Sequence, residues 1–329
     1  MRRILKLALE KPELVGLILL VVLVTLFQVR SGGVFLSANN MRGIFGLLPE
    51  TALVAVGVTL LMICGEFDVS VGSVFALMPM TMAVLFVGGW PFWPAFCVGL
   101  AVCALIGFLN GWITIRFDIP SFITTLGMMF MARSMTVVVS GGFPPRIRPG
   151  EVPSQLFVGF IDAGGFFRAS VLWFACIAII IALLLSRTNF GNWVRATGGF
   201  MPAAQAMGIH TGRVKIACFM ICSMLAGLAG TIQSLRLNSF LPSIGMGMEL
   251  QAIAAAVIGG TSLAGGVGSI LGGLIGATII RVMDNGMVMS QISGNWFQFA
   301  IGALTIFAVV GNSWLRRRGR AMKVETVRK

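Results

Sequence analysis

Residues 46–64 form the stretch GLLPETALVAVGVTLLMIC, an apolar run with one charged side chain, Glu50. A helix rises about 1.5 Å per residue, so about 20 apolar residues cross the roughly 30 Å hydrocarbon core of a bilayer. Similar runs recur along the whole chain, whose residues are 57% hydrophobic and only 11% charged. Soluble domains carry roughly 25% charged residues. The sequence therefore predicts an all-α polytopic membrane protein and excludes a water-soluble globule.

Apolar runs and the residues that interrupt them predict about ten transmembrane helices. They are expected near residues 14–29, 46–64, 71–88, 95–114, 121–141, 170–186, 215–235, 250–265, 268–285 and 296–312. An even number of crossings places both termini on the same side of the membrane. From an inside N-terminus, the chain then places segment 142–169 outside and segment 187–214 inside.

The net charge of +13 is concentrated beside the predicted spans. Lys and Arg gather before residue 14 and after residue 312, and cytoplasmic flanks are the ones that carry such an excess. We therefore expect both termini to be cytoplasmic and read the charge as contact with lipid headgroups, not nucleic acid. The predicted divisions are a basic N-terminal segment (1–13), a transmembrane domain (14–312) that includes the cytoplasmic loop 187–214, and a basic C-terminal tail (313–329).

Residues 64–73, CGEFDVSVGS, place two carboxylates and two hydroxyls among apolar neighbours, and we call them the first break. An ionised carboxylate at mid-bilayer costs about 2.5–3.5 kcal/mol on insertion scales, so such groups face a protein interior or a water-filled path. A structural interpretation is that Asp68 or Ser70 caps the helix that follows. The two interpretations are compatible, because broken helices at transport sites present their ends to polar ligands.

Residues 259–269, GGTSLAGGVGS, are the second break. Gly268, Gly272 and Gly276 continue at a spacing of four residues, which predicts one small-residue face for tight helix packing. Packing alone explains this stretch, and a share in a translocation path is the alternative.

The sequence lacks the common motifs for nucleotide hydrolysis, zinc binding and catalytic triads. No lysine follows a glycine as a phosphate-binding G-x-x-x-x-G-K-[ST] loop requires, so we expect no ATP hydrolysis by this chain. His210 is the only histidine, which excludes an H-E-x-x-H zinc site and a conventional triad base. We therefore predict no catalytic residues, no metal site and no cofactor bound by this chain.

The inside loop contains the stretch PAAQAMGI at residues 202–209. Proline suits a first helical turn and glycine a helix stop, and Ala203, Ala206 and Met207 fall on one face. We predict a short amphipathic helix that lies against lipid or docks on a cytosolic partner.

Three stretches resemble the inner-membrane permeases of ribose-type ATP-binding cassette (ABC) sugar importers. GEFDVSVGS at 65–73 resembles the family's G-G-I-D-L-S-V-G-S, and RATGG at 195–199, with AA at 203–204 and GI at 208–209, is similar to R-A-x-G-G-N-x-x-A-A-x-x-x-G-I. LQAIAAAVIGGTSLAGG at 250–266 resembles L-D-A-I-A-A-V-V-I-G-G-T-S-L-A-G-G. The resemblance extends from about residue 50 to residue 312.

This resemblance implies a multi-pass permease subunit of a bacterial inner membrane that moves a monosaccharide or similar small polyol by alternating access. It implies a second permease copy, identical or not, two ATPase subunits that use ATP on the cytoplasmic side, and a sugar-binding protein outside. Residues on or near the substrate path would be Glu66, Phe67, Asp68, Ser70, Ser73, Thr261 and Ser262. Coupling to the ATPases would fall to Gly198, Gly199, Pro202, Ala203, Ala204, Met207, Gly208 and Ile209.

The sequence departs from the family pattern at a few positions, and other functions stay open. Glu66 and Phe67 replace Gly and Ile, Phe200 replaces Asn, and Gln251 replaces Asp, so the identity of the solute is open. One rival is a proton-coupled transporter that works alone, with a carboxylate as the titrating group. Its candidates are Glu50, Glu66, Asp68 and Asp284. A receptor or passive channel is a further rival, although the sequence shows no distinct sensing domain.

Overall fold

A computed structural model describes residues 13–145, 151–162 and 164–327. Within these residues the chain is helical, and the sole β feature is an isolated bridge between Phe160 and Arg168. The predicted all-α class is therefore confirmed for the described chain. The predicted basic segment 1–13 lies outside the described residues except for Glu13, and so do residues 328–329 of the predicted tail.

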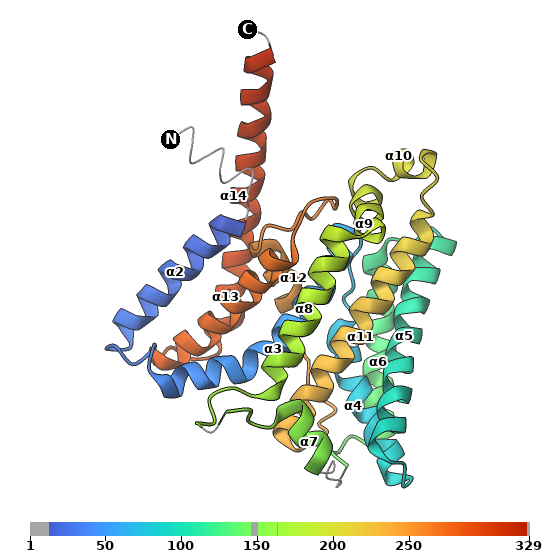
Figure 1. The fold of residues 1–329 in the computed structure, drawn as a ribbon, viewed down its shortest axis with the longest axis vertical. Coiled ribbons are helices and arrows are strands. Elements are labelled where there is room, and N and C mark those ends of the chain that lie inside the picture. Colours follow the sequence, from blue (N-terminus) through green and yellow to red (C-terminus); the bar gives the residue numbers. More distant parts are fainter. Residues whose placement is uncertain (1–12, 146–150, 163, 328–329) are drawn as a thin grey trace.

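The helices follow one another along the chain as labelled in Figure 1. They are α2 (Glu13–Arg30), α3 (Ala38–Ile63), α4 (Val71–Val87), α5 (Phe92–Arg116), α6 (Ser121–Ser140), α7 (Glu151–Val158), α8 (Ala169–Arg187), α9 (Asn189–Gly199), α10 (Met201–Ala206), α11 (Thr211–Leu237), α12 (Met248–Ile258), α13 (Ile270–Met289) and α14 (Trp296–Val327).

Seven of the described helices are long and apolar enough to cross a membrane: α2, α3, α5, α6, α8, α11 and α13. Three shorter apolar stretches, in α4, α12 and the first part of α14, coincide with the predicted spans 71–88, 250–265 and 296–312. The count of ten crossings and the cytoplasmic side of both ends stay predictions.

Several predicted boundaries are wrong. The span predicted at 250–265 ends as a helix at Ile258, because Gly260, Gly265 and Gly266 have positive φ and the chain turns instead of continuing the helix. Helix α3 begins at Ala38, eight residues before the predicted start, and carries Pro49 inside it. Helix α14 continues past the predicted end of its span and through most of the predicted tail. The short helices α7 and α9 were not predicted.

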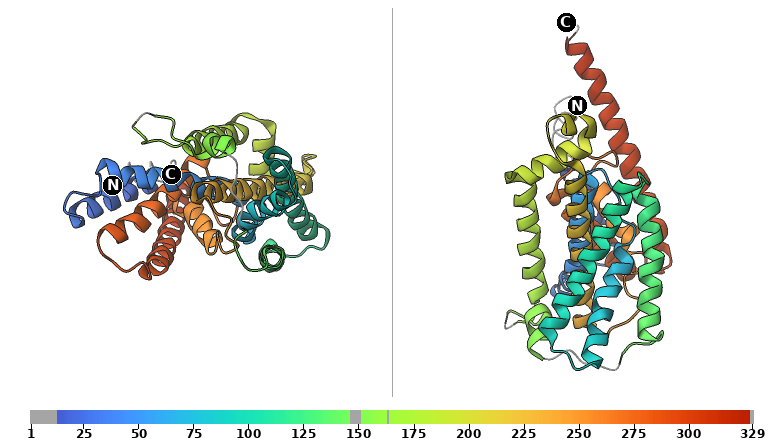
Figure 2. Two further views of the ribbon diagram at one scale, coloured as in Figure 1. Left: turned by 90° about the horizontal axis from the view of Figure 1, so that it is seen from below. Right: turned by 90° about the vertical axis from the view of Figure 1, so that its right-hand side faces the viewer.

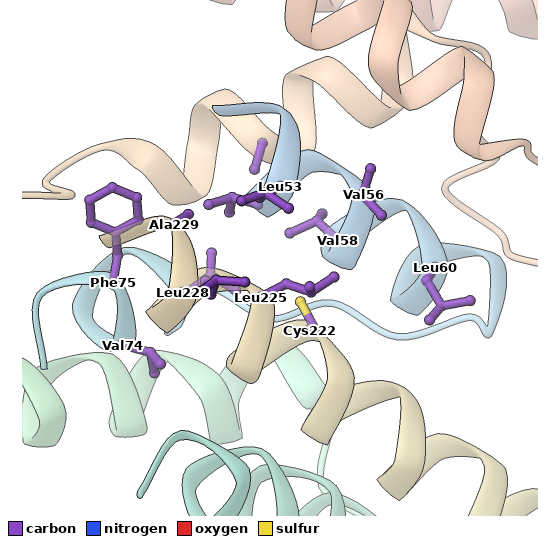
Figure 3. Packing of buried hydrophobic residues seen from close by; sticks show 14 of the residues in the cluster. Leu53, Val56, Val58, Leu60, Val74, Phe75, Cys222, Leu225, Leu228 and Ala229 are labelled. Atoms are coloured by element: carbon purple, nitrogen blue, oxygen red, sulfur yellow. The ribbon is translucent and has the colours of Figure 1, made fainter. Parts of the chain in front are cut away.

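Helix α11 lies at the centre of the packing, against α3, α4 and α5. Figure 3 shows the apolar side chains that fill the space between α3, α4 and α11, with Leu53, Phe75 and Leu225 among them. A second buried cluster joins α2, the first half of α3, α12, α13 and α14. Helices α2, α5, α6 and α8 leave long apolar faces exposed, as lipid-facing helices do.

Helices α5, α6, α8 and α11 run roughly alongside one another in Figure 1, which gives this part of the molecule an upper and a lower end. In Figure 1, α9, α10 and the C-terminal end of α14 lie at the upper end, and α7 lies at the lower end. The right-hand view of Figure 2 shows the last part of α14 extending beyond the other helices at that same upper end. The C-terminal end of α14 and the helices of the predicted cytoplasmic loop therefore lie at the same end.

Candidate functional site

The centre of the first break is a buried hydrogen-bonded cluster around Asp68, which has no solvent-exposed surface. Its Oδ1 accepts hydrogen bonds from the backbone N–H of Ser70 at 2.7 Å and from the Ser70 hydroxyl at 2.5 Å. The amide Nδ2 of Asn110 on α5 donates to Ser70 Oγ at 3.0 Å and to Asp68 Oδ2 at 3.4 Å. Three polar side chains are thus brought together inside an apolar bundle.

The capping interpretation of this stretch holds for Asp68 but not for Ser70. Ser70 occupies the N-cap position of α4, but its backbone is already helical, with a φ of −75° and a ψ of −11°, and within the described chain its side chain makes no capping hydrogen bond. Asp68 Oδ1 accepts a hydrogen bond from the N–H of Ser70, one of the first four N–H groups of the helix, which lack an intrahelical acceptor. Asp68 therefore binds the Ser70 hydroxyl and also satisfies one N–H group at the start of α4.

Two neighbouring helices hold the rest of the first break. Lys215 on α11 places its Nζ 2.5 Å from Glu66 Oε1, and both side chains are largely buried. The backbone N–H of Phe67 donates to Ser121 Oγ at 3.2 Å, and that of Val69 donates to Thr125 Oγ1 at 3.1 Å. Ser121 and Thr125 lie one turn apart on α6, so the break extends along this helix. Non-helical backbone at membrane depth is tolerated only where protein or a cavity surrounds it.

Four functional candidates were missed in the sequence: Asn110, Ser121, Thr125 and Lys215. Asn110 and Lys215 are polar residues within predicted spans, and an amide or a charge there is a signal that hydropathy alone could have found. The hydroxyls of Ser121 and Thr125 carry no such signal, since serine and threonine are common in membrane helices.

The second break is held by its own backbone. The N–H of Thr261 donates to Ala256 O at 2.9 Å, and that of Ser262 donates to Val267 O at 2.8 Å. Thr261 and Ser262 are both buried. The hydroxyl of Thr261 has no hydrogen-bond partner among the described residues. The second break therefore presents at least one buried hydroxyl that is not used for folding.

Gly65, Gly198, Gly265 and Gly266 meet backbone to backbone, and we call them the glycine junction. A Cβ at Gly198 would overlap the carbonyl oxygen of Ile63 and lie 2.8 Å from the N atom of Gly266, and one at Gly265 would lie 2.8 Å from Cα of Gly65. The N–H of Gly266 also donates to Ile63 O at 2.8 Å. The end of α9 is thus in direct contact with both breaks.

The predicted amphipathic helix is shorter than expected, with α10 covering six residues, Met201–Ala206. Gly208 follows with a φ of +82°, as a helix stop requires. Ala204 is buried, whereas Pro202, Ala203, Met207 and Gly208 are exposed and Ile209 is partly buried. The apolar face of this helix therefore has no cover in the described chain.

The glycines predicted to form one packing face are divided between a turn and a helix. Gly272 and Gly276 lie on α13, where a Cβ would overlap the carbonyl oxygens of Gly259 and Ala255, respectively. Gly268 precedes the N-cap Ser269 and lies in the second break, so the expectation that it shares the helical face is wrong. The described residues include no group of three or more His, Cys, Asp or Glu that could hold a metal ion.

Comparisons with known proteins show what the sequence is similar to. The family model described as branched-chain amino acid transport system, permease component, matches residues 40–309. The ribose import permease protein of Escherichia coli strain K12 is 34% identical over 303 residues, which cover 92% of each chain. The xylose transport system permease protein of the same strain is 31% identical over 357 residues, which cover 91% of each chain.

The xylose/arabinose import permease protein of Sulfolobus acidocaldarius is 30% identical over 315 residues, which cover 93% of this chain and 86% of that protein. No solved structure matches the chain. The resemblance found in the three motifs is confirmed, and this multi-pass protein belongs to the family of transport-system permeases that the matching family model describes.

Proposed function

We propose that this chain is the transmembrane permease subunit of an ABC importer that carries a monosaccharide or similar small polyol into the cytoplasm. Its power comes from ATP hydrolysed by two partner ATPase subunits at the end of the molecule where α10 lies. A second permease copy completes the path, and a binding protein delivers the solute from outside. The sugar permeases among its relatives support the solute class.

The observation that carries this proposal is the glycine junction. Helix α9 leads directly into α10, and its last residues touch both Gly65 of the first break and Gly266 of the second. We expect a displacement of α10 by a cytoplasmic partner to move both breaks, because close-packed interiors are poorly compressible and transmit strain. That is the mechanical link that alternating access requires between the ATPases and the solute path.

The exposed side chains around α10 suit a protein partner. Met207 is 82% exposed and Phe200 is 67% exposed, and they lie on either side of this short helix. Apolar side chains on a projecting helix fit a groove on a cytosolic partner, and methionine adapts its shape to such a groove. An ATPase subunit with an apolar groove is the partner we assign to this surface.

The two breaks form a weakly hydrophilic lining for the solute. Asp68, Ser70 and Thr261 offer a carboxylate and hydroxyls, which bond to sugar hydroxyls without holding them tightly. Helix α12 has 11 residues, and at about 1.5 Å per residue it covers only about half of a bilayer. We therefore expect the second break to complete its crossing and ten crossings in all, with both termini cytoplasmic in an inner membrane.

The proton-coupled rival finds less support in the structure. Glu50 bonds to Arg236 through both carboxylate oxygens, at 2.6 and 3.2 Å, and Glu66 pairs with Lys215. Asp284 pairs with Arg281 at 3.1 Å. Each of these three carboxylates is thus already engaged in a structural ion pair in the described chain. Asp68 is the remaining candidate for that mechanism.

The test is reconstitution of the chain in liposomes, alone and with its ATPases and binding protein. We expect accumulation of sugar only with the complete complex and ATP, and accumulation by the chain alone under a proton gradient would overturn the proposal. Met207→Glu should uncouple ATP hydrolysis from transport, while Met207→Leu keeps the apolar contact and serves as the matched control. Ala204 and Gly208 are poor targets, because Ala204 is buried and Gly208 has a positive φ.

A further inference from the structure

Arg133 is a charged residue inside the membrane span α6 whose contacts differ from those of the other cations in the spans. Lys215 pairs with Glu66 and Arg281 pairs with Asp284. The guanidinium of Arg133 instead donates to three backbone carbonyls. Its Nη1 bonds to Pro242 O and Ile244 O, both at 2.9 Å, and its Nη2 bonds to Gly72 O at 2.8 Å.

The three carbonyls belong to two segments that are far apart in the sequence. Gly72 lies in the first turn of α4, directly after the Asp68 cluster of the first break. Pro242 and Ile244 belong to the turn between α11 and α12, and this turn leads through α12 to the second break. Arg133 therefore bridges the start of α4 and the turn that precedes α12.

The two bridged segments are also in tight contact with each other. A Cβ at Gly72 would lie 2.5 Å from Gly245 O, and a Cβ at Gly245 would lie 2.5 Å from Gly72 O. The carboxylate of Glu249, in the first turn of α12, lies beside Gly72 as well. A planar guanidinium with its donors in a fixed fork can bond to carbonyls on both segments, whereas a lysine ammonium is a point charge on a flexible stem.

Helix α12 is consequently attached near both of its ends to the first break and its flanks. Arg133 joins its start to α4, and the glycine junction joins the segment after its end to Gly65. We propose that Arg133 is a positioning residue for translocation, which makes the start of α4 and the turn before α12 move as one body. The polar groups of the two breaks then keep their spacing while the path opens and closes. This inference rests on the proposed function.

The experiment compares Arg133→Lys and Arg133→Gln with the native chain in the reconstituted complex, measuring sugar uptake and ATP hydrolysis together. Both variants should lower uptake by about tenfold, the equivalent of about 1.4 kcal/mol, and raise the ATP consumed per sugar. The matched control is Arg281→Lys, another arginine in a span, which keeps the ion pair with Asp284 and loses one bond from Nε to Thr51 Oγ1. Because Arg281 does not bridge the two breaks, this variant should keep the native ratio of ATP to sugar even if its melting temperature falls.

Other outcomes overturn the inference in distinguishable ways. If Arg133 only balances the charge of Glu249, Arg133→Lys will restore uptake. If its role is only structural, the variants will lower yield and melting temperature, and the folded fraction will keep the native ratio of ATP to sugar. Arg133→Lys keeps the charge and decides the matter should Arg133→Gln fail to fold. A native complex that does not couple ATP to uptake would instead refute the proposed function.

Discussion

The two breaks both place non-helical backbone inside an apolar helical bundle, and different kinds of contact hold each of them. The first break is held by side chains: Asp68 and Glu66 bond to Asn110 on α5 and Lys215 on α11, and the N–H of Phe67 donates to Ser121 on α6. The second break is held by backbone hydrogen bonds and by glycines that allow close approach. Both interrupt apolar helices at membrane depth, where unsatisfied backbone groups are costly.

The difference suggests that the two breaks have different roles. Side chains that bond across the bundle fix the polar groups of the first break in place, and on the proposed function this break would contact the solute. Glycine contacts let the second break sit against the end of α9, and on the proposed function this break would receive movement from the ATPases. Each substitution below changes either the first break, or the second break and its contact with α9.

Gly198→Ala should have the largest effect. Its Cβ would overlap backbone atoms of Ile63 and Cys64, which cannot move aside as a flexible side chain can. We expect loss of transport and a stability cost at or above the upper end of the about 1–3 kcal/mol that overpacking causes. Thermal melting in detergent and ATP-driven uptake measure the two effects.

Gly199→Ala is the matched control, because the atom nearest to its Cβ in the described chain is Cα of Gly266 at an ordinary 3.9 Å. Equal damage from the two neighbouring substitutions would show that the close contact at Gly198 is not the cause.

Glu66→Gln should have the next largest effect. It leaves the charge of Lys215 without its partner, and we expect a cost of about 2 kcal/mol, below the 3–5 kcal/mol for a fully buried pair because both side chains keep some exposure. The charge-swapped double variant Glu66→Lys with Lys215→Glu should recover part of this stability in a double-mutant cycle. Additive losses in the cycle would mean that the pair does not stabilise the first break.

Asn110→Ala should cost less, about 1–2 kcal/mol, because Asp68 and Ser70 lose one donor but keep their bonds to each other. Uptake should fall as well, since the polar groups of the first break lose their fixed geometry. Thr114→Val is the control on the same face of α5, one turn away. Its hydroxyl is without a partner in the described chain, so its removal should leave melting unchanged.

Thr261→Val should have the smallest effect on stability, near zero, because its hydroxyl bonds to no described residue. If that hydroxyl contacts the solute, the KM for uptake should rise while maximal ATP hydrolysis is retained. An unchanged KM would remove Thr261 from the solute path and leave the second break with its mechanical role alone.

The sequence predicted helix positions well where charges end the apolar runs. Helices α2 and α8 end at Arg30 and Arg187, each within one residue of its predicted boundary. It predicted α12 poorly, because the glycines after Ile258 are apolar and leave the hydropathy of the run intact while they change the backbone.

The sequence predicted which polar residues belong to the candidate site, but it did not predict which residues they contact. Asp68 and Ser70 stand out as polar residues in an apolar run, and the structure places them together. Their partner Asn110, and the pairing of Glu66 with Lys215, depend on which helices are neighbours in the bundle. Spacing within one sequence does not determine those neighbours, so these contacts required the structure.

The glycine junction consists of main chain alone, and this has a consequence for how such proteins change over time. On the proposed function, side chains that contact the solute can be exchanged without altering the backbone contacts that transmit movement from the ATPases. A variant with new side chains at residues 66–71, which keeps Gly65 and Gly72, should therefore accept a different solute while it still responds to the same ATPases. On the proposed function, the preference for a solute and the response to the ATPases would then change independently of each other.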